Sequence, residues 1–276
     1  MPAADPSAVI LAAGSGTRFG GMKQLAAIGP EGIAIMDVLI RRAARSGFAK
    51  AVIVVAPGME ASVRVHIDEH RDPTATIPVE LVGQRVPHGR TKPLGTADAV
   101  LAARSAIDGS FAVMNADDLY PEDAFTHLGA HLRETPSVEH ALVAFRVGRT
   151  LIGNRPVSRA LVDVEGGFGL ATIREGTVTH DGDGLRFEGR TGRAVPLSAD
   201  QIISMNIWGF RTSVFDALAG AVGEFVANER EGEVYLPDVV ASMIASGAVV
   251  RVFVSEGACV GVTHAEDVAA VTAALR

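Results

Sequence analysis

Short apolar runs alternate with amphipathic stretches over the first half of the chain, and glycine and proline separate them. Five apolar runs predict buried strands, at 7–13, 51–56, 78–83, 110–116 and 137–147. Three amphipathic stretches predict helices, at 33–46, 59–70 and 96–107. Strands that alternate with helices predict βαβ units, and these predict a mostly parallel sheet.

The pattern changes between about residues 148 and 200, where glycine pairs and Asp-Gly turns separate short alternating segments. Such turns are typical of hairpins, so we predict an antiparallel hairpin insertion here rather than an independent domain. The α/β pattern then returns, with strands at 202–210 and 249–254 and helices at 213–227, 236–246 and 265–275. The predicted fold is α/β, one Rossmann-like doubly wound domain over residues 1–276 with a mixed, mostly parallel sheet.

Composition removes several functional classes. The 276 residues suffice for a sizeable core, and 48% apolar with 21% charged residues is ordinary for a soluble protein. No apolar run approaches the roughly 18 residues of a membrane-spanning helix, and no secretory signal is visible. The net charge of −7 argues against a nucleic-acid partner, and the single Cys259, expected to be buried, excludes an intramolecular disulfide. A cytoplasmic enzyme without a membrane partner is the expectation.

The loop that follows the first predicted strand, Leu11 to Leu25, carries the clearest chemical signal. Its glycines present backbone N–H groups to an anion and let a phosphate approach closely. A dinucleotide fingerprint fails because Phe19 stands at its third glycine position, and a Walker loop fails because Met22 stands in place of lysine. What remains is a phosphate loop with two cations, Arg18 and Lys23, suited to different phosphates of a triphosphate chain.

Further motifs match one family, in its order. LAAGSGTR…K (11–23) resembles the signature loop of sugar-1-phosphate nucleotidyltransferases, in the nucleoside-triphosphate transferase superfamily. The other matches are the base-side segment KPLGTADAV (92–100), the metal-binding strand end MNADD (114–118), the sugar-side strand SMNIWGF (204–210), and YLPDVV (235–240) with GVTHAED (261–267) in the C-terminal part. The resemblance implies that about 1–147 binds the nucleotide, about 148–200 is the insertion on the sugar side, and about 201–276 completes that side.

An acidic pair follows the predicted strand at 110–116. Asp117 and Asp118 are expected outside the carboxyl edge of the sheet, on the same edge as the glycine loop, where oxygen ligands suit Mg²⁺. The resemblance implies that Asp117 is the first metal ligand. It also implies a second ligand near the C-terminus, but the segment 258–260 has no carboxylate, and Glu256 is the nearest candidate.

The remaining site residues follow from the resemblance position by position. Nucleotide binding is expected from Leu11, Ala12, Ala13, Gly14, Ser15, Gly16, Gln84, Lys92, Gly95 and Thr96. The resemblance implies that Gln84 contacts the edge of a pyrimidine base and that Lys92 lies near phosphate or ribose. Thr96 also fits plain helix capping. Arg159, Glu175 and Asn206 are expected near the hexose and its phosphate. Many relatives follow this glutamate with a basic residue, whereas this chain has Gly176, so the identity of the sugar stays open.

Two histidine pairs and the only tryptophan have competing explanations. His66 and His70 match the H-x-x-E-H spelling of a zinc peptidase, but the sequence offers no evident third ligand. His127 and His131 share the same spacing, and we expect them on a solvated helix face. Trp208 can stack on a sugar face, but a core position is favoured.

The function predicted is Mg²⁺-dependent transfer of a nucleotide from a nucleoside triphosphate to a sugar-1-phosphate, with release of pyrophosphate; UTP or dTTP is favoured from Gln84, and GTP and CTP stay open. Arg18 and Lys23 would stabilise phosphate charge, and no protein nucleophile is needed because the acceptor phosphate is already ionised. A cytidylyltransferase acting on a phosphorylated alcohol such as phosphocholine, or a molybdopterin-type nucleotidyltransferase, would differ only in the acceptor pocket. A non-catalytic nucleotide-sugar sensor is the alternative of another class. A homodimer would be unsurprising for this family.

Overall fold

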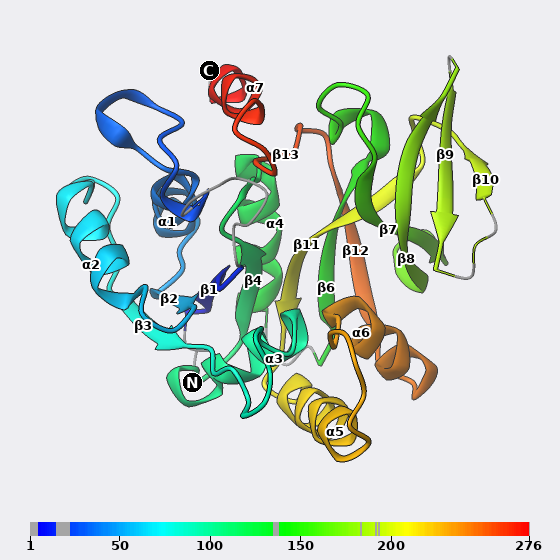
Figure 1. Ribbon diagram of the computed structural model, residues 1–276, viewed down its shortest axis with the longest axis horizontal. Helices are drawn as coiled ribbons and strands as arrows, with labels where there is room; N and C mark the ends of the chain where they lie inside the picture. The colour runs from blue at the N-terminus through cyan, green and yellow to red at the C-terminus, as the bar shows by residue number, and fades with distance from the viewer. Residues whose placement is uncertain are drawn as a thin grey trace.

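The computed structural model describes residues 5–14, 23–134, 138–182, 184–190, 192 and 194–275. In this part of the chain one mixed sheet of eleven strands runs through the molecule, in the order β10-β9-β8-β12-β6-β11-β4-β1-β2-β3, with β7 paired to β11 and β8 (Figure 1). Its strands are β1 Ser7–Ala12, β2 Lys50–Val55, β3 Val79–Gly83, β4 Phe111–Asn115, β6 His140–Arg146, β7 Val157–Glu165, β8 Gly169–Asp181, β9 Gly184–Gly189, β10 Ala194–Leu197, β11 Ile202–Phe210 and β12 Val250–Ser255. The short strands β5 Asp118–Leu119 and β13 Val260–Gly261 pair with each other.

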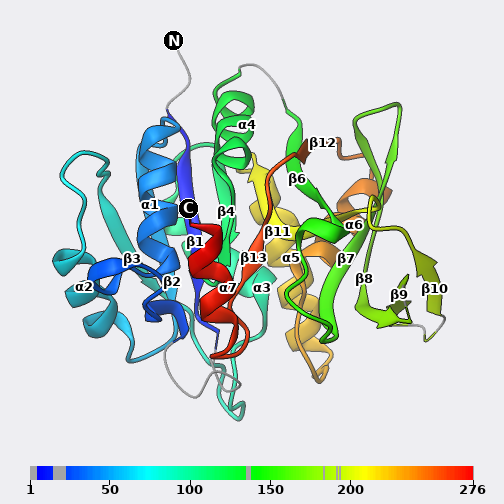
Figure 2. The same ribbon diagram turned by 90° about the horizontal axis from the view of Figure 1, so that it is seen from above.

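Helices cover both faces of this sheet. They are α1 Ile35–Arg45, α2 Glu60–Glu69, α3 Thr96–Ala102, α4 Glu122–Arg133, α5 Val214–Ala227, α6 Leu236–Ala245 and α7 Asp267–Ala274, with short 3₁₀ turns at 23–25, 30–32, 103–106 and 147–149. Figures 1 and 2 show α1, α4 and α7 on one side of the sheet and α3, α5 and α6 on the other. The prediction of an α/β fold with a mixed sheet is confirmed. The expectation that the sheet is mostly parallel is wrong: among the described strands four pairs of this sheet are parallel and seven are antiparallel, because the strands between residues 148 and 200 join the same sheet.

Strand β1 illustrates why the core has two layers. Successive side chains of a strand point to opposite faces, and all six residues of β1 are buried. Ala8 and Ile10 pack into the core beneath α1 and α4, whereas Val9 and Leu11 pack into the core beneath α3, α5 and α6. A strand buried on both faces reads as a continuous apolar run, which is the pattern that predicted it.

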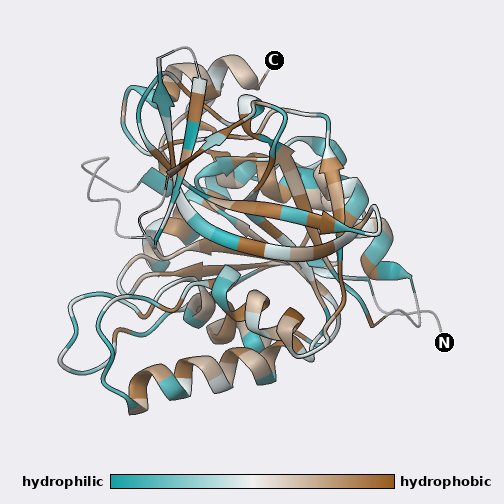
Figure 3. Cartoon of the chain, turned by 90° about the vertical axis from the view of Figure 1, so that its right-hand side faces the viewer, coloured by the Kyte–Doolittle hydropathy of each residue, from teal (hydrophilic) through white to brown (hydrophobic). Residues whose placement is uncertain are grey.

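Parallel pairing is concentrated on one half of the sheet. There β1 lies between β2 and β4, with β3 outside β2, and all three pairs are parallel. Strand β11 then runs antiparallel to both β4 and β6, while β12 is parallel to β6. Between residues 148 and 200, strands β7 to β10 pair antiparallel, and β8 joins this part of the sheet to β12. In Figure 3 these hairpin strands change between teal and brown along their length, as expected for strands with one buried face.

Helix α4 corrects one sequence expectation. His131 of α4 is 2% exposed rather than solvated, and its Nε2 lies 3.2 Å from the Glu139 carbonyl oxygen. The His127 ring stacks on Phe253 of β12 at 5.1 Å between centroids. The two histidines therefore lie on the packed side of α4. The core position favoured for Trp208 and the burial expected for Cys259 are both confirmed, since each is 0% exposed.

Candidate active site

The end of β1 brings part of the glycine loop to the carboxyl edge of the parallel strands. Leu11, Ala13 and Gly14 line a cavity of about 240 Å³ at this edge. Ala12 is fully buried in the opposite core layer, so its side chain faces away from that cavity. The Gln24 side chain donates from Nε2 to the Gly14 carbonyl oxygen at 2.6 Å and so fixes the start of the loop. The predicted residues Ser15, Gly16 and Arg18 lie outside the described residues.

Lys23 lies on the other side of the loop and pairs with the acidic end of β4. Its Nζ donates to Oδ2 of Asp117 at 2.5 Å, and the two side chains are only 20% and 25% exposed. Both residues line the same cavity as Leu11 and Gly14. The structure therefore brings the predicted cation and the predicted metal ligand together, although 94 residues separate them in the sequence.

The second acid of the pair, Asp118, lies deeper than Asp117. Its Oδ2 accepts a hydrogen bond from Nδ2 of Asn115 at 2.8 Å. Burial, followed by the neighbouring charge of Asp117, raises the pKa of Asp118 to about 6, against the opposing effect of Arg159. Lys23 pairs with Asp117, and the Asn115 amide donates to Asp118, so the site holds two adjacent carboxylates. They provide the hard oxygen donors that Mg²⁺ prefers.

On the base side, Gln84 is held in one orientation. Its side chain is 3% exposed, and Nε2 donates to the Gly95 carbonyl oxygen at 3.0 Å and to Oδ2 of Asp98 at 2.7 Å. Both partners can only accept, so the network decides which end of the amide carries the N–H groups. The Gln84 carbonyl oxygen Oε1 accepts no hydrogen bond from the described residues. Lys92 is exposed and lines the same cavity.

The turn before α3 is packed against a distant segment. Gly95 has φ +107°, and a Cβ there would lie 2.8 Å from the Val234 carbonyl oxygen, so only glycine fits. Thr96 begins α3, as predicted, but its Oγ1 makes no cap there. It accepts instead from the backbone N–H of Leu236 at 2.9 Å and so caps the start of α6. This contact brings Glu233 to the cavity wall, which the sequence did not indicate.

The three predicted sugar-side residues meet in a second cavity of about 170 Å³. Glu175 is half-buried and has neither a hydrogen bond nor an ion pair with any described residue. The pKa of its carboxyl group is raised, and burial is the main cause. Arg159 donates to the Thr150 carbonyl oxygen at 3.0 Å, but its buried Nε has no partner among the described residues. A carboxylate without a hydrogen-bond partner among the described residues and a guanidinium therefore line one hollow.

Gly176 shows why the chain lacks a basic residue after Glu175. A Cβ at Gly176 would overlap the Glu188 carbonyl oxygen and the ring of Phe187. Arg159 of β7 lies directly opposite Gly176 in the pairing of β7 with β8. The cation on this side of the site is therefore carried by the neighbouring strand.

A row of amides connects the two cavities. Asn206 donates from Nδ2 to Oδ1 of Asn115 at 2.8 Å, and its own Oδ1 accepts from Nε1 of Trp208 at 2.8 Å. Asn206 has φ +60°, an uncommon left-handed conformation that asparagine tolerates well. Asn115 and Thr96 line both cavities, so the two hollows share a wall. Asn115 belongs to the MNADD motif, but the sequence gives no sign of its role, because an amide at the end of a strand has no distinctive spacing.

Glu256 does not reach the acidic pair. It follows β12, is 72% exposed, and lies 3.9 Å from the Arg146 guanidinium, outside the cavities described above. The C-terminal residue that faces the acids is Gly261, which pairs with Asp118 and has no room for a Cβ. The expected second ligand from this segment is thus not brought to Asp117. The short strand β13 occupies that position through its backbone.

Comparison with known families places most of the chain in one of them. Residues 8–224 match the model of the MobA-like NTP transferase domain. The chain belongs to that family. As a member of it, the protein is a nucleotidyltransferase-type enzyme, and the family resemblance predicted from the sequence is confirmed. A comparison with curated proteins found no match.

Solved structures share the fold of this transferase over nearly its whole length. The inositol-1-phosphate CTP transferase from T. maritima has a TM-score of 0.68 at 13% identity, covering 99% of this chain and 97% of its own. A UDP-glucose pyrophosphorylase complexed with UDP-glucose has a TM-score of 0.61 at 14% identity, with 99% and 98% covered. HddC from Yersinia pseudotuberculosis has a TM-score of 0.57 at 13% identity, with 98% and 100% covered. At these identities the likeness concerns the fold alone.

No helix among the described residues has both the length and the apolar character needed to cross a membrane.

Proposed function

We propose that this transferase joins UTP or dTTP to a sugar-1-phosphate and releases pyrophosphate. The observation that carries the proposal is the pair of adjoining cavities, which share Thr96 and Asn115. One cavity has the glycine loop, Lys23 and Asp117 on its wall, as a triphosphate requires. The other has Arg159 and Glu175, as a phosphorylated polyol requires.

The base preference rests on Gln84. Because Asp98 and Gly95 take its N–H groups, the amide offers only Oε1 to a ligand. Uracil and thymine present an N3–H donor, which suits such an acceptor. Cytosine presents an acceptor at N3 and a donor only at its amino group. The fixed amide therefore favours UTP or dTTP over CTP.

The acceptor preference rests on Glu175 and Arg159 in the second cavity. The Glu175 carboxylate suits hydroxyl donors, and the Arg159 guanidinium suits a phosphate oxygen. The phosphate and hydroxyls of a sugar-1-phosphate satisfy both groups at once. A phosphorylated amino alcohol such as phosphocholine brings a cation and no hydroxyl, so it leaves the Glu175 side chain without a hydrogen-bond donor.

In the proposed reaction an oxygen of the acceptor phosphate bonds to the α-phosphorus of the nucleotide. The bond from that phosphorus to the bridging oxygen of the β-phosphate breaks, and pyrophosphate leaves. Lys23 holds the phosphate chain in place and stabilises its charge, and Arg18 takes the same role by the family resemblance. Asp117 would hold Mg²⁺, with Asp118 beside it; when bound, the ion supplies positive charge that offsets the phosphates. The single buried cysteine fits a reducing, cytoplasmic setting.

The test is pyrophosphate release with Mg²⁺ over a grid of nucleoside triphosphates against sugar-1-phosphates, inositol-1-phosphate and phosphocholine. We expect release that requires UTP or dTTP together with one sugar-1-phosphate, and that stops when a chelator removes the metal. Release with CTP and a phosphorylated alcohol would replace the proposal by the cytidylyltransferase. Tight nucleotide binding without turnover across the grid would favour a non-catalytic sensor.

A further inference from the structure

The two histidines that the sequence left without a third ligand meet one in the structure. His66 lies in the last turn of α2 and His70 directly follows the helix, and their rings stack with 4.2 Å between centroids. Asp37, in the first turn of α1, faces them: its Oδ2 lies 2.8 Å from Nε2 of His66. The ligand atoms of all three residues lie within 4.8 Å of one another.

We propose that Asp37, His66 and His70 bind one transition-metal ion of the zinc class, which ties the start of α1 to the end of α2. Two imidazoles and a carboxylate are a donor set typical of Zn²⁺, whereas Mg²⁺ prefers oxygen ligands alone. Zinc lies about 2.0–2.1 Å from such ligands in a tetrahedron, which requires ligand atoms roughly 3.3 Å apart. The three ligand atoms, which lie within 4.8 Å of one another, must therefore move closer together when an ion binds.

The surrounding hydrogen bonds already orient two of the three ligands. Nδ1 of His70 lies 2.9 Å from the His66 carbonyl oxygen, which can only accept, so this nitrogen donates to it. A metal-binding histidine usually donates its other N–H to such a carbonyl or carboxylate. Oδ2 of Asp37 accepts from the Ala34 backbone N–H at 2.8 Å, which holds the carboxylate toward α2.

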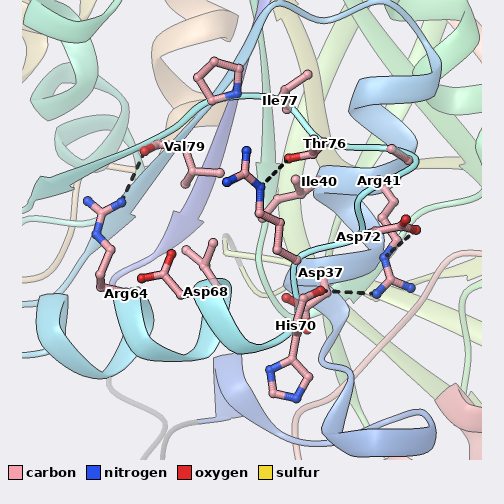
Figure 4. Close-up of a pocket in the computed structure, with 14 residues that line it drawn as sticks. Asp37, Ile40, Arg41, Arg64, Asp68, His70, Asp72, Thr76, Ile77 and Val79 are labelled. Carbon is pink, nitrogen blue, oxygen red and sulfur yellow. Dashed lines mark hydrogen bonds and ion pairs between the residues drawn. The ribbon is translucent and has the colours of Figure 1, made fainter.

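Burial and access also suit a bound ion. Asp37 is 5% and His66 9% exposed, so an ion there would be largely shielded from water. A cavity of about 310 Å³ reaches the site, with Asp37 and His70 on its wall (Figure 4). The cationic Arg41 beside them is offset by Asp72, 3.4 Å away. The cavity gives an ion a path from solvent.

The arrangement does not support peptidase chemistry. Glu69, which the H-x-x-E-H spelling would make the general base, is exposed. The proposed ion is therefore structural: it fastens α1, the helix that follows the Lys23 loop, to α2. The competing explanation is a plain hydrogen bond between Asp37 and His66 that needs no metal.

The experiment uses the full chain, freed of metal with a chelator and dialysed, and titrated calorimetrically with Zn²⁺. Excess Mg²⁺ is present throughout, so that the carboxylates at Asp117 are occupied. We expect one Zn²⁺ per chain. His66→Gln and His70→Gln should each weaken binding by more than about 10²-fold, since loss of even an outer-shell partner costs about 10–100-fold.

The matched control is His127→Gln, which alters the other i, i+4 histidine pair on a packed helix and should leave zinc affinity unchanged. Circular dichroism reports whether each variant is folded. The absorption spectrum of Co²⁺ bound to the unmodified chain gives a second readout that needs no variant, because a four-coordinate site with nitrogen ligands absorbs far more strongly than a six-coordinate oxygen site. Absent zinc binding, a weak oxygen-type Co²⁺ spectrum, or zinc affinity unchanged in both histidine variants would each overturn the proposal. None of these outcomes depends on nucleotidyl transfer.

Discussion

The parallel half of the sheet, β3-β2-β1-β4, and the half that begins at β11, here called the antiparallel half because all its pairs except β6 with β12 are antiparallel, supply the two cavities in different ways. In the parallel half the strands end at one edge, so the Gly14 loop, Gln84 and Asp117 each come directly after a strand. In the antiparallel half, Arg159, Glu175 and Asn206 lie inside strands and meet through cross-strand register. The first half positions chemistry by where strands end, and the second by which residues face each other.

This difference has a consequence for substitutions. Substitutions in the parallel half should affect nucleotide binding and the rate of pyrophosphate release. Substitutions in the antiparallel half should affect binding of the acceptor and the stability of the hairpin strands. The predictions below separate the two halves, from the largest expected effect to the smallest.

Lys23→Ala should lower the rate of pyrophosphate release about 10²–10³-fold, or about 3–4 kcal/mol, because a preorganised charge aimed at the phosphates is lost. Lys50→Ala is the control. Lys50 pairs with Glu80 and Asp108 at the far end of β2, and its loss should leave the rate near normal. Turnover of Lys23→Ala close to that of the unmodified chain would contradict the role given to this lysine.

Glu175→Gln should raise the KM of the acceptor about 10–100-fold and leave the KM of the nucleotide almost unchanged. Hydrogen bonds to a charged group contribute about 1.5–3 kcal/mol, and the substitution keeps the shape while removing the charge. Glu188→Gln, on the exposed side of β9, serves as the control. An equal rise in the KM of the acceptor and the KM of the nucleotide would contradict the assignment of Glu175 to the acceptor alone.

Gly176→Ala should lower the free energy of unfolding by about 1–3 kcal/mol, because the added methyl overlaps Phe187 and the Glu188 backbone. Gly189 is directly opposite Gly176 in the pairing of β8 with β9, and its nearest contact for a Cβ is 3.7 Å. Gly189→Ala should therefore change stability by less than about 0.5 kcal/mol. Urea unfolding of the two variants measures the contrast, and equal losses would refute the steric explanation.

Stability should fall on acidification, in part through His140 at the start of β6. Burial lowers the pKa of His140 to about 4, and the charge of Arg211 acts in the same direction. The unfolded chain, with a pKa near 6.5, binds the proton more readily, so stability is lost as pH falls from 6.5 toward 4. Between pH 7 and 5 this group should cost about 2 kcal/mol.

His140→Asn keeps an acceptor for the Arg211 backbone N–H, which lies 3.2 Å from Nδ1, but does not titrate. Urea unfolding at the two pH values should therefore give the variant a smaller loss than the unmodified chain. Equal losses would show that other groups carry the acid sensitivity. His131, whose pKa burial also lowers, is still present in both proteins and contributes equally.

Asp98→Asn should reduce the preference for UTP over CTP about fivefold, the value of one hydrogen bond of about 1 kcal/mol. An amide at position 98 can donate as well as accept, so it no longer fixes which end of the Gln84 amide faces the base. The ratio of kcat/KM for UTP and CTP measures the effect, with the exposed Asp108→Asn as control. An unchanged ratio would leave Asp98 with no part in base selection.

Prediction from the sequence succeeded where the position of a residue follows from the strand just before it in the chain. The apolar runs located β1, β2 and β4, and the residues after them could be placed at one edge because parallel strands end together. The histidine spacing placed His127 and His131 on a helix, but His131 was expected in water and is buried, because burial depends on what packs over a helix face. Glu256 was proposed from its place in the chain, but β12 directs it toward Arg146.

The sequence alone determined the alternation of strands and helices, the family, and the local motifs to which phosphate, metal and base contacts are assigned in the proposal. It could do so because hydrophobic period and turn residues act over a few positions. Only the tertiary structure decided that Lys23 meets Asp117, that Asp98 fixes Gln84, that Arg159 faces Gly176, and that Asp37 reaches His66. These are contacts between segments far apart in the chain, and they depend on sheet order and register, which no local pattern specifies.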